Sequence, residues 1–253
     1  MDPIESQLQL FQSVSLPELE KVALLDRMDT KYVFTREQLP EFLKVLKNHY
    51  FILEIDEKRM FRYESLYFDT DDFSLYNHHY CGRLNRYKVR FRKYVESDLS
   101  YFEIKFKNNK GRTIKSRIKH TTSDAIHGQA LDLLHEKTPL EAHGLKAKMW
   151  VNYTRITLVS NDFKERLTLD LDLAFKNEDE VKTVDELIIA EVKQSKSGQS
   201  VFSKLMKKQH IRRGSISKYC FGVASLFNNI RVNNFKSQIL YLNRILYASP
   251  AGH

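Results

Sequence analysis

The chain has 253 residues, 42% hydrophobic and 29% charged, with only 8 Gly and 5 Pro, which excludes collagen-like, low-complexity and wholly disordered proteins. Its net charge of +9 is concentrated between Arg83 and Lys119, where 13 basic residues stand against 3 acidic ones, so the rest of the chain is close to neutral. Such a concentration predicts a polyanionic partner: nucleic acid, an anionic membrane, or a nucleotide or polyphosphate.

The chain shows no sign of export or of a membrane span. Its first six residues lack the basic and apolar regions of a signal peptide, and no stretch approaches the ~20 apolar residues of a span. Cys81 and Cys220 cannot build a disulfide framework and lack the paired spacing of a zinc site. We therefore expect a soluble protein of the reducing cytoplasm, folded as a single domain over residues 1–253, since no linker or repeat divides it.

Hydrophobic periodicity predicts both helices and strands along the chain. Ser15 and Thr35 are candidate N-caps of the first two helices. The expected helices span residues 17–25, 35–48, 72–80, 123–135, 200–211, 217–228 and 233–247. Eight strands are expected at residues 27–34, 60–68, 85–95, 100–107, 112–119, 148–159, 165–173 and 186–193, with a hairpin turn at 108–111.

Several of the expected strands alternate a charged row with an apolar row, and in a strand these two rows lie on opposite faces. In residues 87–92, for example, Lys88, Arg90 and Arg92 alternate with Tyr87, Val89 and Phe91. The same pattern sets Leu169, Leu171 and Leu173 against Thr168, Asp170 and Asp172. Other charged or polar rows are Glu103, Lys105 and Lys107; Arg27, Asp29 and Lys31; Thr113, Lys115 and Arg117; Glu191 and Lys193; and Tyr153 with Arg155.

Two arrangements can explain these rows. They are either the wet outer face of an ordinary antiparallel sheet or the lining of a tunnel. Like charges on neighbouring strands repel one another, and an anion held between them would remove that penalty. A closed barrel of about eight strands has just enough interior for one small ligand. We therefore expect an α+β fold in which an eight-stranded antiparallel β-barrel forms a cationic tunnel and helices pack outside.

At these residues the sequence resembles the catalytic domain of the VTC polyphosphate polymerases, in the triphosphate tunnel metalloenzyme (CYTH-like) superfamily. The similarity runs from about Arg27 to Tyr219. It rests on the order of short motifs, each weak alone. They are Arg27-Met-Asp-Thr-Lys-Tyr, Tyr67-Phe-Asp-Thr, Lys88-Val-Arg-Phe-Arg, Glu103-Ile-Lys, Lys115, Tyr153-Thr-Arg, Asp170, Glu191-Val-Lys and Ser217-Lys-Tyr.

The resemblance implies a tunnel that binds a triphosphate through inward Lys and Arg side chains, with an acidic side chain holding Mn²⁺ or Mg²⁺. In the VTC branch the γ-phosphoryl of ATP is transferred to a growing polyphosphate chain. The superfamily signature Glu-x-Glu-x-Lys is matched here by Arg27, Asp29 and Lys31, so a basic residue stands at the first position. VTC-type domains share that basic position, which favours a polymerase over cyclase, thiamine-triphosphatase or capping-type relatives.

From the resemblance and the charge pattern we expect a set of phosphate-binding residues. Arginine binds phosphate oxygens in a fork and lysine offers a compact charge. Within this set Lys31, Arg90, Arg92, Arg155 and Lys218 are expected to act in catalysis, through positioning and charge neutralisation. The full set is Arg27, Lys31, Lys88, Arg90, Arg92, Lys105, Lys115, Tyr153, Arg155, Lys193 and Lys218, whereas Lys107, Arg112, Arg117 and Lys119 are assigned to the surface or the tunnel mouth.

Glu191 is the expected metal ligand, because Mg²⁺ and Mn²⁺ prefer carboxylate oxygen, and the alternative is a salt bridge to a tunnel lysine. Asp170 is a second candidate ligand that would otherwise neutralise cations, which is the role expected for Glu103. Tyr153 either donates its hydroxyl to phosphate or packs as an aromatic ring.

Other chemistries find little support. A histidine metal site at His78 and His79 is not expected, because adjacent positions of a helix do not face one another. Cys81 and Cys220 are interpreted as buried small hydrophobic residues. No nucleophile elbow and no glycine-rich phosphate loop occurs in the sequence.

The leading hypothesis is therefore a metal-dependent phosphotransferase, an ATP-using polyphosphate polymerase. One alternative is hydrolysis of tripolyphosphate or nucleoside triphosphates in the same tunnel. Another is a non-catalytic module that binds polyanions or single-stranded nucleic acid, suggested by aromatics among the basic residues. Alternation places most of those aromatics on the opposite face, so nucleic acid is not the expected partner. The aromatics concerned are Tyr87, Phe91, Tyr94, Tyr101, Phe102 and Phe106.

A separate membrane protein is a further candidate partner. Residues 233–247 place Phe235, Ile239, Leu242 and Leu246 at helical spacing. This helix either packs on the barrel or docks to a membrane protein, which would hold a cytoplasmic chain peripherally at the membrane.

Overall fold

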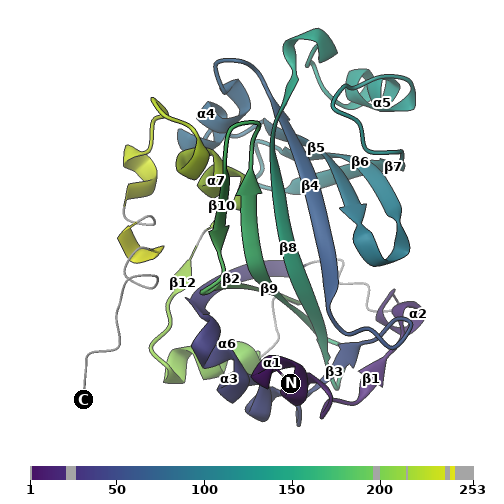
Figure 1. Ribbon diagram of the computed structural model, residues 1–253, viewed down its shortest axis with the longest axis vertical. Helices are drawn as coiled ribbons and strands as arrows, with labels where there is room; N and C mark the ends of the chain where they lie inside the picture. Colours follow the sequence, from purple (N-terminus) through teal and green to yellow (C-terminus); the bar gives the residue numbers. More distant parts are fainter. Residues whose placement is uncertain (1, 21–26, 196–199, 215, 237–239, 243–253) are drawn as a thin grey trace.

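The computed structural model describes residues 2–20, 27–195, 200–214, 216–236 and 240–242 (Figure 1). One long, curved sheet dominates the molecule, with the strand order β12-β2-β11-β9-β8-β4-β5-β6-β7, and all neighbours on this path are antiparallel. These strands are β2 Arg27–Thr35, β4 Phe61–Asp69, β5 Arg86–Tyr94, β6 Leu99–Lys107, β7 Thr113–Lys119, β8 Lys146–Ser160, β9 Glu165–Lys176, β11 Leu187–Ser195 and β12 Arg213–Gly214.

The eight strands expected from alternation are confirmed, each within three residues of its predicted bounds. Shorter strands extend the sheet beside β8 and β9. These are β1 Ser13–Val14, β3 Tyr50–Leu53 and β10 Val181–Val184, with β1 and β3 paired in parallel. The expectation of a closed barrel is not met: over the described residues no ladder joins β7 to β2 or β12. The sheet is therefore a strongly curved, open tunnel wall.

Within the described ranges, seven helices and four 3-10 turns surround the sheet. They are α1 Pro3–Leu8, α2 Leu16–Glu20, α3 Leu39–Leu46, α4 Ser74–Tyr80, α5 Gln129–Lys137, α6 Val201–Lys208 and α7 Lys218–Leu226, with η1 Arg36–Gln38, η2 Val95–Ser97, η3 Ala142–Gly144 and η4 Asn233–Phe235. Two helix predictions need correction. The helix expected at 123–135 begins only at Gln129, after Gly128 at φ +55°, and the one expected at 35–48 opens with a 3-10 turn.

Two predicted helices fall partly outside the described residues. The first, at 17–25, is described only as α2. The last, at 233–247, is described as η4 and as residues 236 and 240–242, of which Leu242 is buried in the same apolar cluster as α7. The hydroxyl of Tyr241 donates to the backbone oxygen of Val33 at 3.2 Å, so this part of the chain packs against β2.

The two faces of the sheet have different partners. On the convex face, α1, α3 and α6 cover β2, β11, β9 and β8, while α5 covers β4, β5 and β6. On the concave face, α7 packs against Val33, Tyr153, Leu173 and Ile189, and it fills one end of the trough. The charged rows lie on the same face, beside α7.

A bulge on β9 splits the leucine row predicted there. Asp172 has φ +52°, and the register between β8 and β9 shifts between Asn152 and Thr154. As a result, Leu169 and Leu171 pack under the convex-face helices, whereas Leu173 lies in the concave cluster with α7. The same bulge removes Asp172 from the row of Asp170, and the Asp172 carboxylate accepts from Arg36 at 2.5 Å instead.

Candidate functional site

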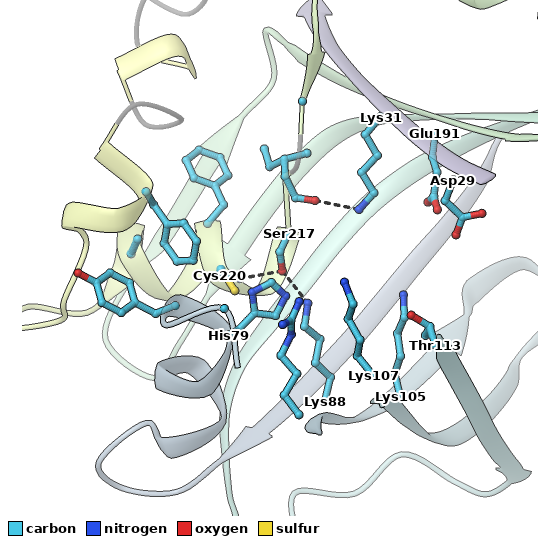
Figure 2. Close-up of a pocket in the computed structure, with 18 of the residues that line it drawn as sticks. Asp29, Lys31, His79, Lys88, Lys105, Lys107, Thr113, Glu191, Ser217 and Cys220 are labelled. Carbon is cyan, nitrogen blue, oxygen red and sulfur yellow. Dashed lines mark hydrogen bonds between the residues drawn. The ribbon is translucent and has the colours of Figure 1, made fainter. Parts of the chain in front are cut away.

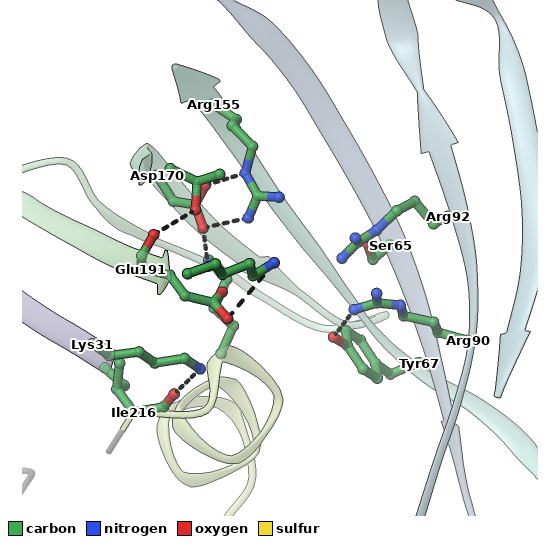
Figure 3. A network of polar contacts seen from close by, with 12 residues as sticks. Lys31, Ser65, Tyr67, Arg90, Arg92, Arg155, Asp170, Glu191 and Ile216 are labelled. Atoms are coloured by element: carbon green, nitrogen blue, oxygen red, sulfur yellow. Dashed lines mark hydrogen bonds and ion pairs between the residues drawn. The ribbon is translucent and has the colours of Figure 1, made fainter. Parts of the chain in front are cut away.

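The charged rows of the two halves of the sheet face one another across the trough. Figure 3 shows Lys31, Arg155 and Glu191 on one side and Arg90 and Arg92 on the other. The cations of the trough come from β2, β5, β6, β7, β8 and β11 and from α7, so they are far apart in sequence. The curvature of the sheet therefore gathers the cations that the sequence placed on separate alternating strands.

Arg155 on β8 and Lys218 at the start of α7 share one buried carboxylate. Arg155 Nε and Nη2 donate to the two oxygens of Asp170 at 2.6 and 2.8 Å, and Lys218 pairs with the same group. Asp170 is 1% exposed. Burial alone would raise the pKa of Asp170, but Arg155 and Lys218 outweigh it and hold that pKa well below its usual range. Two cations against one carboxylate leave this cluster with net positive charge.

The second cluster lies across the trough on β5, β6 and β7. Arg90 donates through Nε and Nη2 to Glu103 at 2.9 and 2.6 Å, and Lys115 pairs with the same carboxylate. Burial would raise the pKa of Glu103, but Arg90, Arg92 and Lys115 lower it to about 2. Arg90 Nη1 also donates to the hydroxyl of Tyr67 at 2.6 Å. Two cations, Arg90 and Lys115, again share one carboxylate, so this cluster also has net positive charge.

Arg92 lies between the two clusters on an aromatic platform. Its guanidinium donates to the hydroxyl of Ser65 at 3.1 Å and stands 5.5 Å from the ring centre of Tyr63 and 6.0 Å from that of Tyr153. Those two rings stack on each other at 5.1 Å, and Arg155 also contacts both of them. Cation–π contacts hold arginines in place without neutralising them. No acidic side chain pairs with Arg92 over the described residues.

The trough opens into a cavity of about 720 Å³ beside α7 (Figure 2). Lys31 Nζ donates to the backbone oxygen of Ile216 at 2.8 Å, and Lys88 Nζ donates to the hydroxyl of Ser217 at 2.8 Å. Lys105 and Lys107 project into the same space from β6. The lining thus brings lysines from β2, β5 and β6 together with the N-terminus of α7.

Burial and neighbouring cations change the proton affinity of several groups in the trough. Burial lowers the pKa of Lys88 to about 8, and burial likewise lowers that of Lys115 to about 8 against the opposing pull of Glu103. For Tyr67, burial would raise the pKa, but Arg90, Arg92 and Lys88 lower it to about 8. An anion bound in the trough would favour the charged forms of Lys88 and Lys115 and so oppose the effect of burial on their pKa values.

Glu191 is a carboxylate of the cavity lining whose ion-pair partner is distant. Among the residues that the structure describes, Glu191 forms one ion pair, to Lys193 at 3.8 Å, and it lines the cavity next to Asp29 (Figure 2). Burial would raise the pKa of Glu191, but Lys193, Lys31 and Arg155 lower it to about 2, so it is ionised at neutral pH. Over the part of the chain described here, no group of three or more His, Cys, Asp or Glu side chains gathers around a possible metal position.

The structure places the residues predicted from sequence as follows. Lys31, Lys88, Arg90, Arg92, Lys105, Lys115, Tyr153, Arg155 and Lys218 contact one another or line the trough, and Lys193 shares the row of Glu191 on β11. Arg27 begins β2, but its side chain lies outside the described residues. Lys107, predicted at the surface or tunnel mouth, lines the cavity.

Sequence reasoning missed the polar and aromatic residues that hold these cations. Tyr63, Ser65 and Tyr67 share one row of β4, and that alternation was available in the sequence. Tyr219, which follows Lys218, stacks on Tyr67 at 4.9 Å and donates its hydroxyl to buried Asp69. No local pattern predicts that last pair, because 150 residues separate its members.

This curved antiparallel sheet with an inward cationic lining is the triphosphate tunnel fold. A family model for the VTC domain matches residues 26–227, and the chain therefore belongs to the VTC domain family. No curated protein sequence matches the chain.

Two solved structures share the fold. One, a candidate adenylate cyclase from Bacillus halodurans, is 16% identical with a TM-score of 0.52, over 80% of this chain and 98% of that one. The other, a candidate adenylyl cyclase from Hippeastrum with a dominant triphosphatase activity, is 11% identical with a TM-score of 0.53, over the same two shares. At these identities the likeness concerns the fold alone.

None of the helices within the described residues is long and apolar enough to cross a membrane.

Proposed function

We propose that the protein is a metal-dependent polyphosphate polymerase that transfers the γ-phosphoryl group of ATP to a polyphosphate chain in the trough. The observation that carries the proposal is the pair of facing clusters around Asp170 and Glu103, each with more cations than carboxylates. A linear polyanion lying between them would contact both sides at once. The match to the VTC domain supports the same activity.

Phosphoryl transfer needs mainly positioning and neutralisation of charge along the line of attack. Arg90, Arg155 and Lys218 are preoriented by carboxylates, so they can contact phosphate oxygens without a large loss of side-chain freedom. Arg92 is held by aromatic rings, which leaves its charge available to the phosphates. Lys31 and Lys88 would exchange their present acceptors at α7 for phosphate oxygens.

Glu191 is the residue we assign to Mn²⁺ or Mg²⁺. Both oxygens of Asp170 are engaged by Arg155 and Lys218, which favours a neutralising role for Asp170, whereas Glu191 has one distant partner and faces the cavity. The lining suits a hard cation held by one or two carboxylates with substrate phosphates and water completing its coordination. Such an ion would supply neutralisation of the charge on the phosphates.

The test is to incubate the purified protein with ATP and Mn²⁺ and to resolve the products by chain length on a gel. A polymerase produces a ladder of polyphosphates longer than three phosphates, together with ADP. Release of orthophosphate without a ladder would contradict the proposal.

Hydrolysis of triphosphates is the second candidate. It is favoured by the fold shared with the Hippeastrum protein, which has a dominant triphosphatase activity. In this reading water takes the place of the polyphosphate acceptor in the same trough, and the gel above separates the two outcomes.

Binding of single-stranded nucleic acid is less well supported. Phe91 and Phe102 are fully buried under α5 on the convex face, and Tyr87 stacks with Phe106 away from the cationic rows. Stacking platforms for bases would have to share a face with the cations. Oligonucleotide binding in the absence of triphosphate binding would restore this alternative.

We also propose that the protein lies in the cytoplasm and docks there to a separate membrane protein. Gentle fractionation of cells tests the docking, because an intact chain found entirely in the soluble fraction would count against it.

A further inference from the structure

A second cavity, of about 410 Å³, lies on the convex side of the same sheet edge. Four basic residues line it, and we call this surface the outer basic groove: Lys207, His210, Arg212 and Arg213. Its apolar wall includes Tyr32 and Ile211. The proposed reaction in the trough makes no use of this surface.

Carboxylates do not neutralise the lysine and the two arginines of the groove within the described part of the chain. Over the described residues no ion pair joins Lys207, Arg212 or Arg213 to a carboxylate. No Asp or Glu follows Glu191 in the sequence, so a carboxylate beside the groove would have to come from an earlier part of the chain. Lys207 can be accounted for by the dipole at the C-terminal end of α6, but Arg212 and Arg213 lie beyond that helix. Their concentration at one place makes this surface suited to an anionic ligand.

Local packing holds the groove in a fixed position. Phe202 and Met206 bury one face of α6 against the sheet, so Lys207 and Lys208 are directed outward at its end. The chain then turns at His210, with φ +57°, and returns to the sheet as β12. Figure 1 shows α6 and β12 connected at this edge of the sheet.

The groove and the trough meet at Arg213, which lines both cavities. Arg213 pairs with Tyr32, whose side chain lies on the convex face, and Gly214 pairs with Lys31, whose side chain lines the trough. Strand β12 is the edge of the sheet and only two residues long. A linear polyanion that leaves the trough beside Lys31 would therefore have to pass only this short edge strand to reach the groove.

We propose that the outer basic groove binds the part of a polyphosphate chain that extends beyond the trough. This inference rests on the proposed function of the trough and adds a second contact for long polymers only. Arg213 lines both the groove and the trough, which favours a linear polyanion over an anionic membrane. A flat membrane surface could contact the groove but could not enter the trough.

The test compares polymers of two lengths on a variant that leaves the trough intact. The double variant Lys207→Ala/Arg212→Ala removes two groove cations that do not line the trough, and Arg213 is retained because it borders both cavities. The matched control Lys58→Ala/Lys164→Ala removes two exposed lysines at other turns of the sheet. Affinity for tripolyphosphate and for a polyphosphate of roughly one hundred units is measured by calorimetry at several salt concentrations.

We expect the groove variant to bind tripolyphosphate as the unsubstituted protein does and to bind the long polymer about 3- to 30-fold more weakly, as for the loss of two exposed charge contacts. Its affinity for the long polymer should also fall less steeply with salt, because fewer counterions are released. The control should match the unsubstituted protein in both respects.

Equal long-polymer affinity in the groove variant and the unsubstituted protein would overturn the proposal. Weakened binding to phosphatidylserine vesicles with unchanged binding to long polyphosphate would overturn it in favour of a membrane surface. If the unsubstituted protein binds neither polymer, the proposed function itself fails, and the tripolyphosphate measurement distinguishes this from a failure of the groove alone. Unchanged tripolyphosphate affinity also shows that the variant is folded.

Discussion

Arg92 differs from the other arginines of the trough in having aromatic rings and a serine as partners in place of a carboxylate. Arg90 and Arg155 are each partly neutralised by the acid beside them. Arg92 therefore has the most charge to offer to an incoming phosphate, although the sequence sets it in the same row as Arg90.

We predict that Arg92→Ala lowers tripolyphosphate affinity by about 10- to 150-fold, as expected for losing one hydrogen bond to a charged group at ~1.5 to 3 kcal/mol. The neighbouring Lys93→Ala is the matched control, because Lys93 pairs with exposed Asp98 outside the trough. Calorimetric titration measures both. Equal affinity in Arg92→Ala and the unsubstituted protein would remove Arg92 from the phosphate site.

A substitution of Glu191 tests whether this residue binds the metal ion. Glu191→Gln preserves the shape of the side chain and removes the charge that a divalent cation needs, so turnover should fall by at least tenfold while metal-free tripolyphosphate binding remains. A steady-state assay across Mn²⁺ concentrations measures the first, and calorimetry in chelator measures the second. Normal turnover with an unchanged metal dependence would reduce Glu191 to a salt-bridge partner of Lys193.

Protonation of Lys88 makes the charge of the trough depend on pH. In the free protein its pKa of about 8 lies below the ~10.4 of an unfolded lysine, so between these values the unfolded chain binds more protons. The contribution of Lys88 to stability in the absence of ligand therefore rises with pH across that window. A bound anion favours the charged lysine and reverses the shift.

It follows that tripolyphosphate binding at about pH 8.5 should take up protons. Calorimetry in buffers with different heats of ionisation measures this uptake. Lys88→Met should reduce it, leaving the share that comes from Lys115 and Tyr67, whose pKa values are also about 8. An uptake that is the same with and without Lys88 would contradict the account.

At the scale of elements, α7 is the part that turns an ordinary curved sheet into a trough with one filled end. Its N-cap Ser217 accepts from the backbone of Cys220 at 3.3 Å and from Lys88 at 2.8 Å, so one hydroxyl connects the helix to the cationic lining. Gly222 allows close approach to the sheet, because a Cβ atom there would lie 2.5 Å from Phe175 and 2.7 Å from Met149.

We predict that Gly222→Ala destabilises the protein by ~1 to 3 kcal/mol through overpacking between α7 and the sheet. Urea unfolding followed by circular dichroism measures the change. Gly144→Ala is the control, since a Cβ at that position meets no atom within 4 Å. An unaltered midpoint in Gly222→Ala would mean that α7 can move away from the sheet without cost.

The strands were predictable because alternation is a local signal and the charged rows kept it over most of their length. The helix at 123–135 was placed too early because Gly128 at φ +55° delays its start, and the break at Asp172 depends on a left-handed residue that is not glycine. Closure of the sheet could not be judged from sequence, since it depends on whether β7 reaches β2 in space.

At the scale of the whole molecule, the positive charge of the sequence is divided between two surfaces. The concave face takes the basic rows of β5, β6 and β7, and the convex edge takes the cations after α6. The cationic side chains that line the trough and the neutralising role of Glu103 could be predicted from the sequence. The particular partners of Glu103 and Asp170 could not, because each ion pair joins residues of different elements.

The most direct test of the central claim is a crystal structure with a non-hydrolysable ATP analogue and Mn²⁺. The account predicts phosphate oxygens of the analogue in contact with Arg90, Arg92, Arg155 and Lys218, and electron density for Mn²⁺ at the Glu191 carboxylate. A nucleotide bound elsewhere on the molecule, with the trough filled only by water at saturating analogue, would contradict it.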